Sequence, residues 1–509
     1  MRPAAALALM AVCSCGFVRA TVPVPSASQL RLAQRGYLDD EVKTMGAPLL
    51  PGLTMFQHFG PCTFETHGYH TSHTCQWDIQ SPLGGPNSGP SYPNSVAPAS
   101  HFNPERLSTD NWMEAAKQLG ASQVCLTVRH VDGFALWPTQ ANNYSVAASP
   151  WRGGKGDVVK DFVASARKAG ISPCFYIILG FDVFSNQSGV TPANYLRQQQ
   201  LALTELLTNY GRIDRLWWDN YAIGCCQPVT HEGFYCAGGG TQARNVSASN
   251  CPNWNAVIET VRRLSPHTAI VPGPDGCLVN GEVAGGTYPL YTTGPPTGGS
   301  YSCSGQGGQF NAQGQGNRFV VSESDYSFVT GNWFWNPGIP YMNAAALWDQ
   351  FTLKYGQGAN LILNVPPNAS GLIPEEYVVE LKKFNRTRVL TYGTPVAQLA
   401  APVTAACAEL SFTVSVDPSS TFDQVVTMED LSKGQQITGY SLEAEFGGTW
   451  QRLNPASGHG ATVGARVVDW GLGKITGVNR LRWNCSAALT NDEITITNFD
   501  AYLGAQQQA

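Results

Sequence analysis

The sequence predicts an α/β fold, a (β/α)₈ TIM-like barrel, followed by a C-terminal all-β sandwich. From residue 50 to about 390, short apolar runs alternate with helical patterns, which is typical of parallel strands covered on both faces. After residue 402, short strands separated by turn residues replace that alternation. We therefore expect a signal peptide over residues 1–20, the barrel over 21–395 and the sandwich over 402–506.

The barrel prediction depends on seven apolar runs, at 53–60, 123–130, 171–179, 212–220, 268–275, 318–325 and 360–367. Helical patterns separate them. In 108–121 a polar residue among Ser108, Thr109 and Asp110 can cap the start, and Gly120 can end the helix; residues 157–170 repeat the pattern and end at Gly170. A glycine-rich phosphate loop after the first strand would indicate a doubly wound sheet, and the sequence has none there.

Composition and termini narrow the class of protein. The 509 residues carry a net charge of only −5 and form no basic stripe, so binding to a nucleic acid by charge is not expected. The first twenty residues have a positive start, a short apolar stretch and a small-residue cleavage site, which predicts a secreted protein. No later segment is apolar for long enough to predict a membrane span.

Cysteine and asparagine usage agrees with export. Cys125 and Cys174 lie inside strand-like runs and are expected to be buried free thiols. The remaining cysteines of the mature chain cluster in loops and resemble disulfide partners; the pairs we expect, although spacing does not fix connectivity, are Cys62–Cys75, Cys277–Cys303 and Cys407–Cys485. Six N-glycosylation sequons stand at Asn143, Asn186, Asn245, Asn368, Asn385 and Asn484.

Polar or ionisable residues close almost every predicted barrel strand, namely His58, His130, Asp219, Asp275, Glu323 and Asp325. The carboxyl ends of barrel strands form the active site in this architecture. Asp219 ends the apolar run "RLWWD". From its position alone it either caps a helix or starts a turn, or it is a nucleophile at the rim of the barrel.

Several longer motifs then follow one another in a recognisable order: "HFG" (58–60), "FNPERL" (102–107), "TVRHVDGFALWPT" (127–139), "LLTNYGRIDRLWWDN" (206–220) and "GPDGCLVNGE" (273–282). They resemble the retaining α-L-fucosidases of glycoside hydrolase family twenty-nine, most of all the branch that prefers α-1,3/1,4-linked fucose. The resemblance implies an exo-acting hydrolase without a cofactor that releases terminal fucose from oligosaccharides or glycoconjugates through a covalent fucosyl-enzyme. Such retention needs two carboxyl groups about 5–5.5 Å apart.

The resemblance also implies the roles of individual residues. Asp219 matches the nucleophile, and Glu282 matches the acid/base, with Glu323 as its rival. The residues implied to contact the sugar are His58, His130, Tyr176, Trp217 and Trp333. Two departures from the family pattern occur: Cys277-Leu278 replace an Arg-Trp pair, and Val131 replaces a second histidine.

Other interpretations stay open at this stage. A degraded site could bind fucose without hydrolysing it, and a related retaining glycosidase could act on a galactoside of similar configuration. The histidines at 67, 70 and 73 lack a helical pattern or a carboxylate at metal spacing, so we expect a loop without a metal. The sandwich either binds carbohydrate or packs on the barrel; "WQRL" (450–453) and "RLRWNC" (480–485), which resemble core strands, favour packing.

Overall fold

The computed structural model describes residues 53–64, 97–130, 132–178, 191–219, 254–270, 321–355, 360–430, 436–455, 463–464, 466–489 and 491–504, and the backbone of four short strands between 226 and 301. The predicted signal peptide, the histidine-rich stretch at 67–73 and Glu282 lie outside these residues. Among the residues described, no helix is both long and apolar enough to span a membrane.

The larger part of the molecule is built on one parallel sheet of eight strands, in the order β7-β4-β3-β2-β1-β11-β10-β8. Its strands are β1 (Leu53–Gln57), β2 (Ala121–Arg129), β3 (Ser172–Ile178), β4 (Arg215–Asp219), β7 (Ala269–Ile270), β8 (Gly276–Leu278), β10 (Val321–Ser327) and β11 (Asn360–Asn364). β7 pairs with β4 and β8 with β10, so the two edge strands of the curled sheet are close neighbours in the sequence. The predicted TIM-like class is confirmed.

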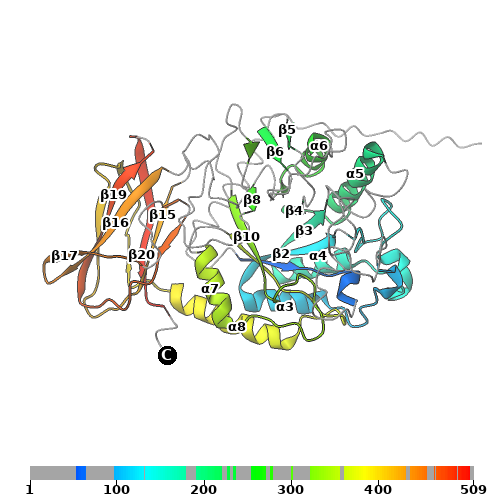
Figure 1. Cartoon of the computed structure of the whole chain (residues 1–509), viewed down its shortest axis with the longest axis horizontal. Helices are drawn as coiled ribbons and strands as arrows, with labels where there is room; N and C mark the ends of the chain where they lie inside the picture. The colour runs from blue at the N-terminus through cyan, green and yellow to red at the C-terminus, as the bar shows by residue number, and fades with distance from the viewer. Residues whose placement is uncertain are drawn as a thin grey trace, which may run out of the picture.

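Helices cover the outside of this sheet (Figure 1): α3 (Thr109–Leu119), α4 (Val158–Ala169), α5 (Pro192–Asn209), α6 (Trp254–Leu264), α7 (Ala344–Tyr355) and α8 (Glu375–Tyr392). Both predicted helices begin and end where the sequence indicates. The Ser108 side chain accepts a hydrogen bond from the Asn111 amide, and Gly120 ends α3 in the left-handed region at φ 78°. Asp157 and Gly170 serve α4 in the same way.

Side chains alternate along each strand between the helices and the interior of the barrel. On β2, Val124, Leu126 and Val128 belong to the main core beneath the helices. Cys125, between them, belongs instead to an interior cluster with Phe56, Cys174, Tyr176, Trp217 and Ile362. This alternation decides which residues of each strand can form a site inside the barrel.

The cysteines correct one prediction and confirm another. Cys125 and Cys174 stand directly opposite each other on β2 and β3, with Cα atoms 4.2 Å apart, and form a disulfide, so the prediction of two free thiols is wrong. Cys407 and Cys485 are bonded as expected. Cys62 is also disulfide-bonded, while Cys75, Cys303 and the side chain of Cys277 lie outside the described residues.

The C-terminal part consists of two antiparallel sheets facing each other. One contains β12 (Ala397–Gln398), β13 (Val403–Ala406), β15 (Gln424–Glu429), β18 (Val467–Asp469) and β20 (Glu493–Tyr502); the other contains β14 (Ser411–Ser415), β16 (Ile437–Phe446), β17 (Thr449–Arg452) and β19 (Val478–Ala488). Trp483 is fully buried between them. Trp450 is only partly buried and lies 4.1 Å from the Arg482 guanidinium, so "WQRL" is not the core strand that we expected.

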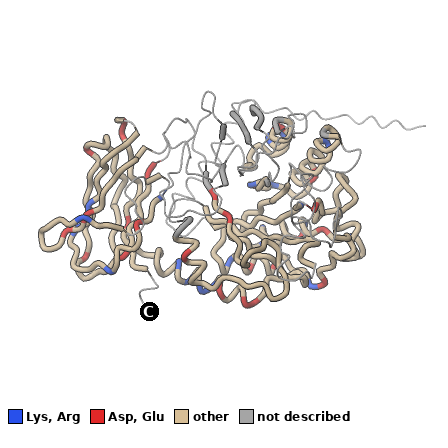
Figure 2. Tube along the Cα trace, viewed as in Figure 1, with Lys and Arg blue, Asp and Glu red and all other residues tan. Residues whose placement is uncertain are grey.

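The sandwich rests on the barrel through α7 and α8 (Figure 1). Val426, Met428 and Tyr502 of β15 and β20 join the main core of the barrel. The Tyr392 hydroxyl at the end of α8 donates a hydrogen bond of 2.7 Å to Gln424 Oε1. Packing is therefore one role of the sandwich. Figure 2 shows acidic and basic residues distributed along the described chain of both parts.

Candidate active site

A continuous cluster of aromatic and imidazole rings lies at the carboxyl ends of β1 to β4. It contains all five residues that were predicted to contact the sugar: His58, His130, Tyr176, Trp217 and Trp333. The Tyr176 ring stacks between His130 and Trp217, with centroids 5.4 and 5.2 Å away and interplanar angles of 13° and 15°. His58 lies 5.4 Å from His130 and 5.1 Å from Trp333. Residues far apart in the sequence are thus brought to one place.

The period of the strands places these rings inside the barrel. On β1 and just beyond it, Thr54, Phe56 and His58 follow one another at intervals of two, the spacing of side chains on one face of a strand. Phe56 packs edge-on against Trp217 at 4.9 Å. Sequence reasoning missed Phe56, although the two-residue interval before His58 was the signal that could have identified it.

A second missed ring is Phe334. Its centroid lies 5.3 Å from that of His130 and 5.5 Å from that of His58, and both contacts are edge-on. Phe334 follows Trp333 in the loop after β10, and the motif "GNWFW" contains both. That motif was the available signal, but the choice among its aromatic residues needed the three-dimensional structure.

Both histidines of the cluster are buried and uncharged at neutral pH. Burial lowers the pKa of His58 to about 3, although its hydrogen bond with Asn364 acts in the opposite direction. Burial also lowers the pKa of His130 well below its ordinary value, and the neighbouring His58 adds to that effect. Neutral imidazoles offer one donor and one acceptor each, which suits hydroxyl groups of a ligand.

Two buried polar atoms of the cluster have no hydrogen-bond partner among the described residues. They are Nδ1 of His130 and Nε1 of Trp217. Buried polar atoms are normally satisfied, because an unmade hydrogen bond costs about 1–3 kcal/mol. A ligand with hydroxyl groups could supply the missing partners.

Asn364, at the end of β11, forms hydrogen bonds with three other segments of the chain beside the cluster, through His58, Ser327 and Trp333. Its Oδ1 accepts the backbone amide of His58 at 3.2 Å and lies 2.8 Å from His58 Nδ1. Its Nδ2 donates to the Ser327 hydroxyl at 2.9 Å and to the Trp333 carbonyl at 2.7 Å. The sequence did not single out this asparagine, because nothing in "NLILNVPP" shows which strands lie beside it.

The two predicted catalytic carboxyl groups are placed only in part. Asp219 is the last residue of β4, in register with Ile178 at the end of β3, and its side chain lies outside the described part of the chain. Glu282 lies outside it altogether. Within the described residues, no three histidine, cysteine or acidic side chains gather in a way that could hold a metal ion.

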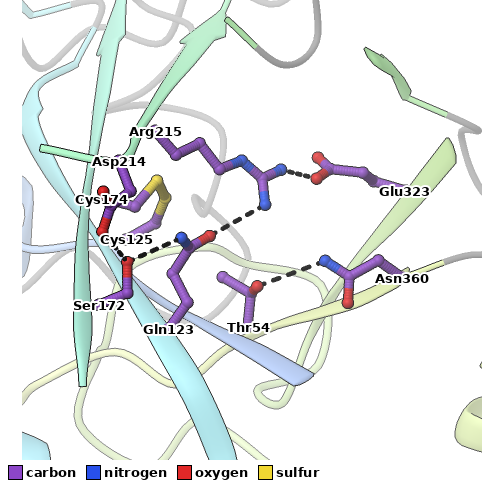
Figure 3. Close-up of a disulfide and its surroundings, with 9 residues drawn as sticks. All are labelled: Thr54, Gln123, Cys125, Ser172, Cys174, Asp214, Arg215, Glu323 and Asn360. Carbon is purple, nitrogen blue, oxygen red and sulfur yellow. Dashed lines mark hydrogen bonds and ion pairs between the residues drawn. A yellow bond between two sulfur atoms is a disulfide. The ribbon is translucent and has the colours of Figure 1, made fainter. Parts of the chain in front are cut away.

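Glu323, the rival acid, lies at the other end of the barrel interior (Figure 3). It forms an ion pair with Arg215, the first residue of β4, and their side chains are 1% and 0% exposed. Arg215 Nη1 also donates to Gln123 Oε1 at 3.1 Å, near the start of β2. Asn360 and Thr54, at the starts of β11 and β1, bond to each other nearby at 3.4 Å.

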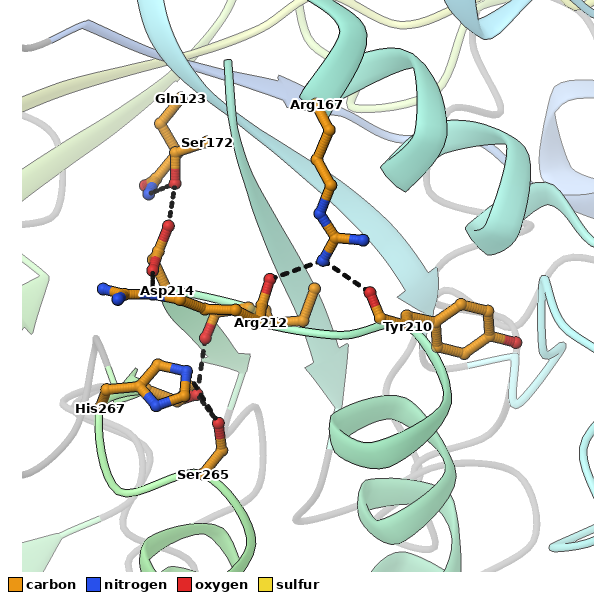
Figure 4. A network of polar contacts seen from close by, with 10 residues as sticks. Gln123, Arg167, Ser172, Tyr210, Arg212, Asp214, Ser265 and His267 are labelled. Atoms are coloured by element: carbon orange, nitrogen blue, oxygen red, sulfur yellow. Dashed lines mark hydrogen bonds and ion pairs between the residues drawn. The ribbon is translucent and has the colours of Figure 1, made fainter. Parts of the chain in front are cut away.

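This layer of polar residues at the amino ends continues to the surface (Figure 4). Gln123 Nε2 donates to the Ser172 hydroxyl at 3.2 Å, and that hydroxyl donates to Asp214 at 3.0 Å. Asp214 Oδ1 forms an ion pair with Arg212 Nε at 2.5 Å, and the Arg212 side chain is 69% exposed. The chain of contacts therefore runs from Glu323 to the surface away from the ring cluster.

Comparison with known proteins gives the family. A family model described as α-L-fucosidase matches residues 53–386, which include every strand of the barrel sheet and every ring of the cluster. The chain belongs to the α-L-fucosidase family. "Alpha-L-fucosidase 1" of Arabidopsis thaliana is 30% identical over 388 residues, which are 74% of this chain and 63% of that protein. A relative from Oryza sativa is covered to 59% of its length, so the chain spans less than two thirds of either.

Solved structures show the same fold over both parts. A glycoside hydrolase 29 family member from an unknown rumen bacterium superposes with a TM-score of 0.69 and 24% identity, over 95% of this chain and 77% of that one. A Ruminococcus gnavus fucosidase in complex with fucose gives a TM-score of 0.67 and 17% identity, over 91% and 95% of the two chains. These family members therefore combine the barrel and the second part in the same way.

Proposed function

We propose that this chain is a secreted, exo-acting α-L-fucosidase that releases terminal α-L-fucose from oligosaccharides or glycoconjugates with retention of configuration. The observation that carries the proposal is the ring cluster at the carboxyl ends of β1 to β4, in a member of the α-L-fucosidase family. The faces of the rings suit the apolar face and methyl group of fucose, and the neutral histidines suit its hydroxyls.

The proposed reaction has two steps. Asp219 attacks the anomeric carbon while the Glu282 carboxyl group gives its proton to the departing glycosidic oxygen, which leaves a fucosyl ester on Asp219. The Glu282 carboxylate then removes a proton from water, the water oxygen attacks the same carbon, and the ester bond to Asp219 breaks. Support comes from the positions of the two residues: Asp219 ends the strand of Trp217, and Glu282 follows the end of β8.

Glu282 is preferred to Glu323 as the acid for a geometrical reason. A general acid must reach the glycosidic oxygen directly or through one water molecule. Glu323 is buried in an ion pair with Arg215 at the amino ends of the strands, whereas Asp219 stands at the carboxyl end of β4. A carboxylate held by a guanidinium is also a poor proton donor.

The preference for α-1,3/1,4 linkages is part of the proposal and has its own test. It is supported by the motifs that the chain shares with that branch. Lewis-type oligosaccharides with branched α-1,3 or α-1,4 fucose should be hydrolysed faster than α-1,2-linked and simple aryl fucosides. Equal or reversed rates would contradict the branch while leaving the family activity intact.

The nucleophile can be tested with a matched pair of variants. Asp219→Gly should lower hydrolysis of an aryl α-L-fucoside by about a thousandfold or more. Azide should restore turnover by attacking from the vacated face, which gives β-L-fucosyl azide. Asp214→Asn, five residues earlier at the opposite end of β4, should remain active. Normal activity of Asp219→Gly would refute the mechanism, and fucose binding without hydrolysis by the wild type would indicate a lectin-like protein.

The acid can be tested through the leaving group. Glu282→Ala should hydrolyse fucosides with a good leaving group far better than natural disaccharides, because only the latter need a proton from the enzyme. Glu323→Gln should show no such dependence among molecules that remain folded. If the dependence appeared in Glu323→Gln instead, the two glutamates would have to exchange roles.

Secretion is supported by residues 1–20 and by the sequons. Among the sequons in the described residues, Asn143 lies exposed in the loop after β2. When the full chain is expressed in a eukaryotic secretory host, we expect the enzyme in the medium, a mature N-terminus after Ala20 and glycan at Asn143. Intracellular retention of an uncleaved chain would contradict this part of the proposal.

A further inference from the structure

The hydrogen bonds around Asn364 fix the orientation of its side-chain amide without ambiguity. The backbone N–H of His58 can only donate, so the Asn364 atom that faces it at 3.2 Å must be the oxygen. The Trp333 carbonyl can only accept, so the Asn364 atom 2.7 Å from it must be the nitrogen. Two independent partners on opposite sides of the amide therefore agree on which atom is Oδ1.

This orientation determines the protonation of the His58 ring. Asn364 Oδ1 lies 2.8 Å from His58 Nδ1, and because an amide oxygen can only accept, Nδ1 must carry the proton. The ring is buried and neutral, so it carries a single N–H proton, and that proton lies on Nδ1. His58 Nε2 is left as a hydrogen-bond acceptor on the side of the ring away from Asn364.

We propose that Asn364 is a positioning residue that holds His58 in the Nδ1–H tautomer, so that His58 Nε2 accepts a hydrogen bond from a substrate hydroxyl. This inference rests on the proposed function for the identity of the substrate, whereas the tautomer follows from the contacts alone. Asn364 also fixes the place of the ring, because it holds the His58 backbone, the Ser327 hydroxyl and the Trp333 carbonyl at once.

The strand of Asn364 supplies a matched control. Asn360 begins β11, is buried, and lies four residues before Asn364. Its side chain bonds to Thr54 at the amino ends of the strands, in the layer opposite the ring cluster. The same substitution at the two asparagines therefore removes a buried amide from the same strand at either end of the barrel interior.

The first measurement concerns the tautomer and needs no activity. In protein labelled with ¹⁵N-histidine, the His58 ring, assigned by comparison with His58→Gln, should carry its proton on Nδ1 between pH 5 and 8. In Asn360→Leu it should remain so, and in Asn364→Leu the Nε2–H tautomer should become populated. An Nε2–H tautomer in the wild-type protein would overturn the inference.

The second measurement concerns catalysis. For an aryl α-L-fucoside, Asn364→Leu should raise KM and lower kcat/KM by about tenfold, since it loosens an acceptor that binds substrate. Asn360→Leu should keep the wild-type values. In Asn364→Asp the carboxylate still accepts the Nδ1 proton but favours the charged ring, so the acid limb of kcat/KM against pH should move up by about 1–3 units.

These outcomes separate the inference from the proposed function. Asn364→Leu and Asn364→Asp both lose the donors to Ser327 and Trp333, so a difference between their pH profiles reports on the acceptor for His58. If the wild-type enzyme hydrolyses the fucoside and both variants keep its KM and pH profile, the positioning role is wrong. If the wild-type enzyme neither binds nor hydrolyses fucosides, the proposed function fails, and the tautomer measurement alone decides the role of Asn364.

Discussion

The two ends of the barrel interior bury polar groups of different kinds. At the amino ends, Arg215 and Glu323 carry full charges, but they neutralise each other, and Gln123 adds a hydrogen bond. At the carboxyl ends the rings are uncharged, yet His130 and Trp217 each leave a buried polar atom without a partner among the described residues. Buried polar atoms without a hydrogen-bond partner among the described residues occur at both ends, Glu323 Oε2 and Asn360 Oδ1 at the amino end included, so what separates the two ends is charge: a buried ion pair lies at the amino end, and neutral rings gather at the carboxyl end.

The largest effect that separates the two ends is expected at Arg215. Replacing it with Met leaves the Glu323 carboxylate buried without its cation, which should cost about 3–5 kcal/mol of unfolding free energy. Urea denaturation would measure this. The double variant Arg215→Met/Glu323→Leu removes both charges and should recover most of the loss. A single variant as stable as the wild type would show that the pair is not a structural element.

Acidification should act on the opposite end. The pKa of His58 is about 3 in the folded protein and ordinary when unfolded, so below about pH 6.5 only the unfolded chain takes up the proton. Its contribution to stability is therefore complete above pH 6.5 and falls by about 1.4 kcal/mol for each unit down to pH 3. The variant His58→Gln cannot titrate there, so its stability should fall less steeply; parallel curves would contradict this.

The sandwich should respond to pH with the reverse sign. Burial raises the pKa of Glu429 to about 8 and that of Asp469 to about 7, although backbone amides and the Tyr440 hydroxyl bond to these carboxyl groups. The folded sandwich therefore holds protons that the unfolded chain loses above about pH 4.5, and its stability should decline as pH rises from there to 8. In Asp469→Asn the unfolding free energy of the sandwich should decline less steeply with rising pH. Urea unfolding at several pH values, monitored by proteolysis of the sandwich, would measure this.

A smaller effect is expected from His130→Leu, with opposite signs for stability and binding. Removing a buried nitrogen that has no described partner should raise the unfolding free energy by about 1 kcal/mol. Fucose affinity should fall about tenfold or more, because the proposed function has this nitrogen bind a sugar hydroxyl. Calorimetric binding and urea unfolding would measure the two. Lower stability together with unchanged affinity would place His130 among the structural residues.

Much of this comparison could be predicted from local signals. The apolar runs gave the strands, and Ser108 with Gly120 gave the ends of α3, because caps depend on neighbouring residues alone. His58 and His130 were identified from their motifs at strand ends, and the structure brings their rings within 5.4 Å. Local signals thus indicated residues that gather at the carboxyl end of the barrel, and their contacts with a sugar stay a prediction.

The contacts that complete the comparison depend on register and closure, which local sequence does not specify. Asn364 lies 306 residues from His58, and β11 meets β1 only because the sheet curls. Glu323 was a candidate acid because it follows an apolar run, and only the register of β10 shows that it faces Arg215. Cys125 and Cys174 were expected to be free thiols because the sequence does not show that the register of β2 and β3 places them directly opposite each other.

The smallest effect on stability is expected at an arginine–glutamate ion pair that is exposed, in contrast to the buried pair of Arg215 and Glu323. Arg482 and Glu443, on the outer face of the sandwich, lie 2.7 Å apart, but their side chains are 32% and 24% exposed. Water already solvates both groups, so breaking the pair by Arg482→Met should change the unfolding free energy by less than about 1 kcal/mol, and salt should reduce that further. If this variant cost as much as Arg215→Met, burial would not be what distinguishes the pair inside the barrel.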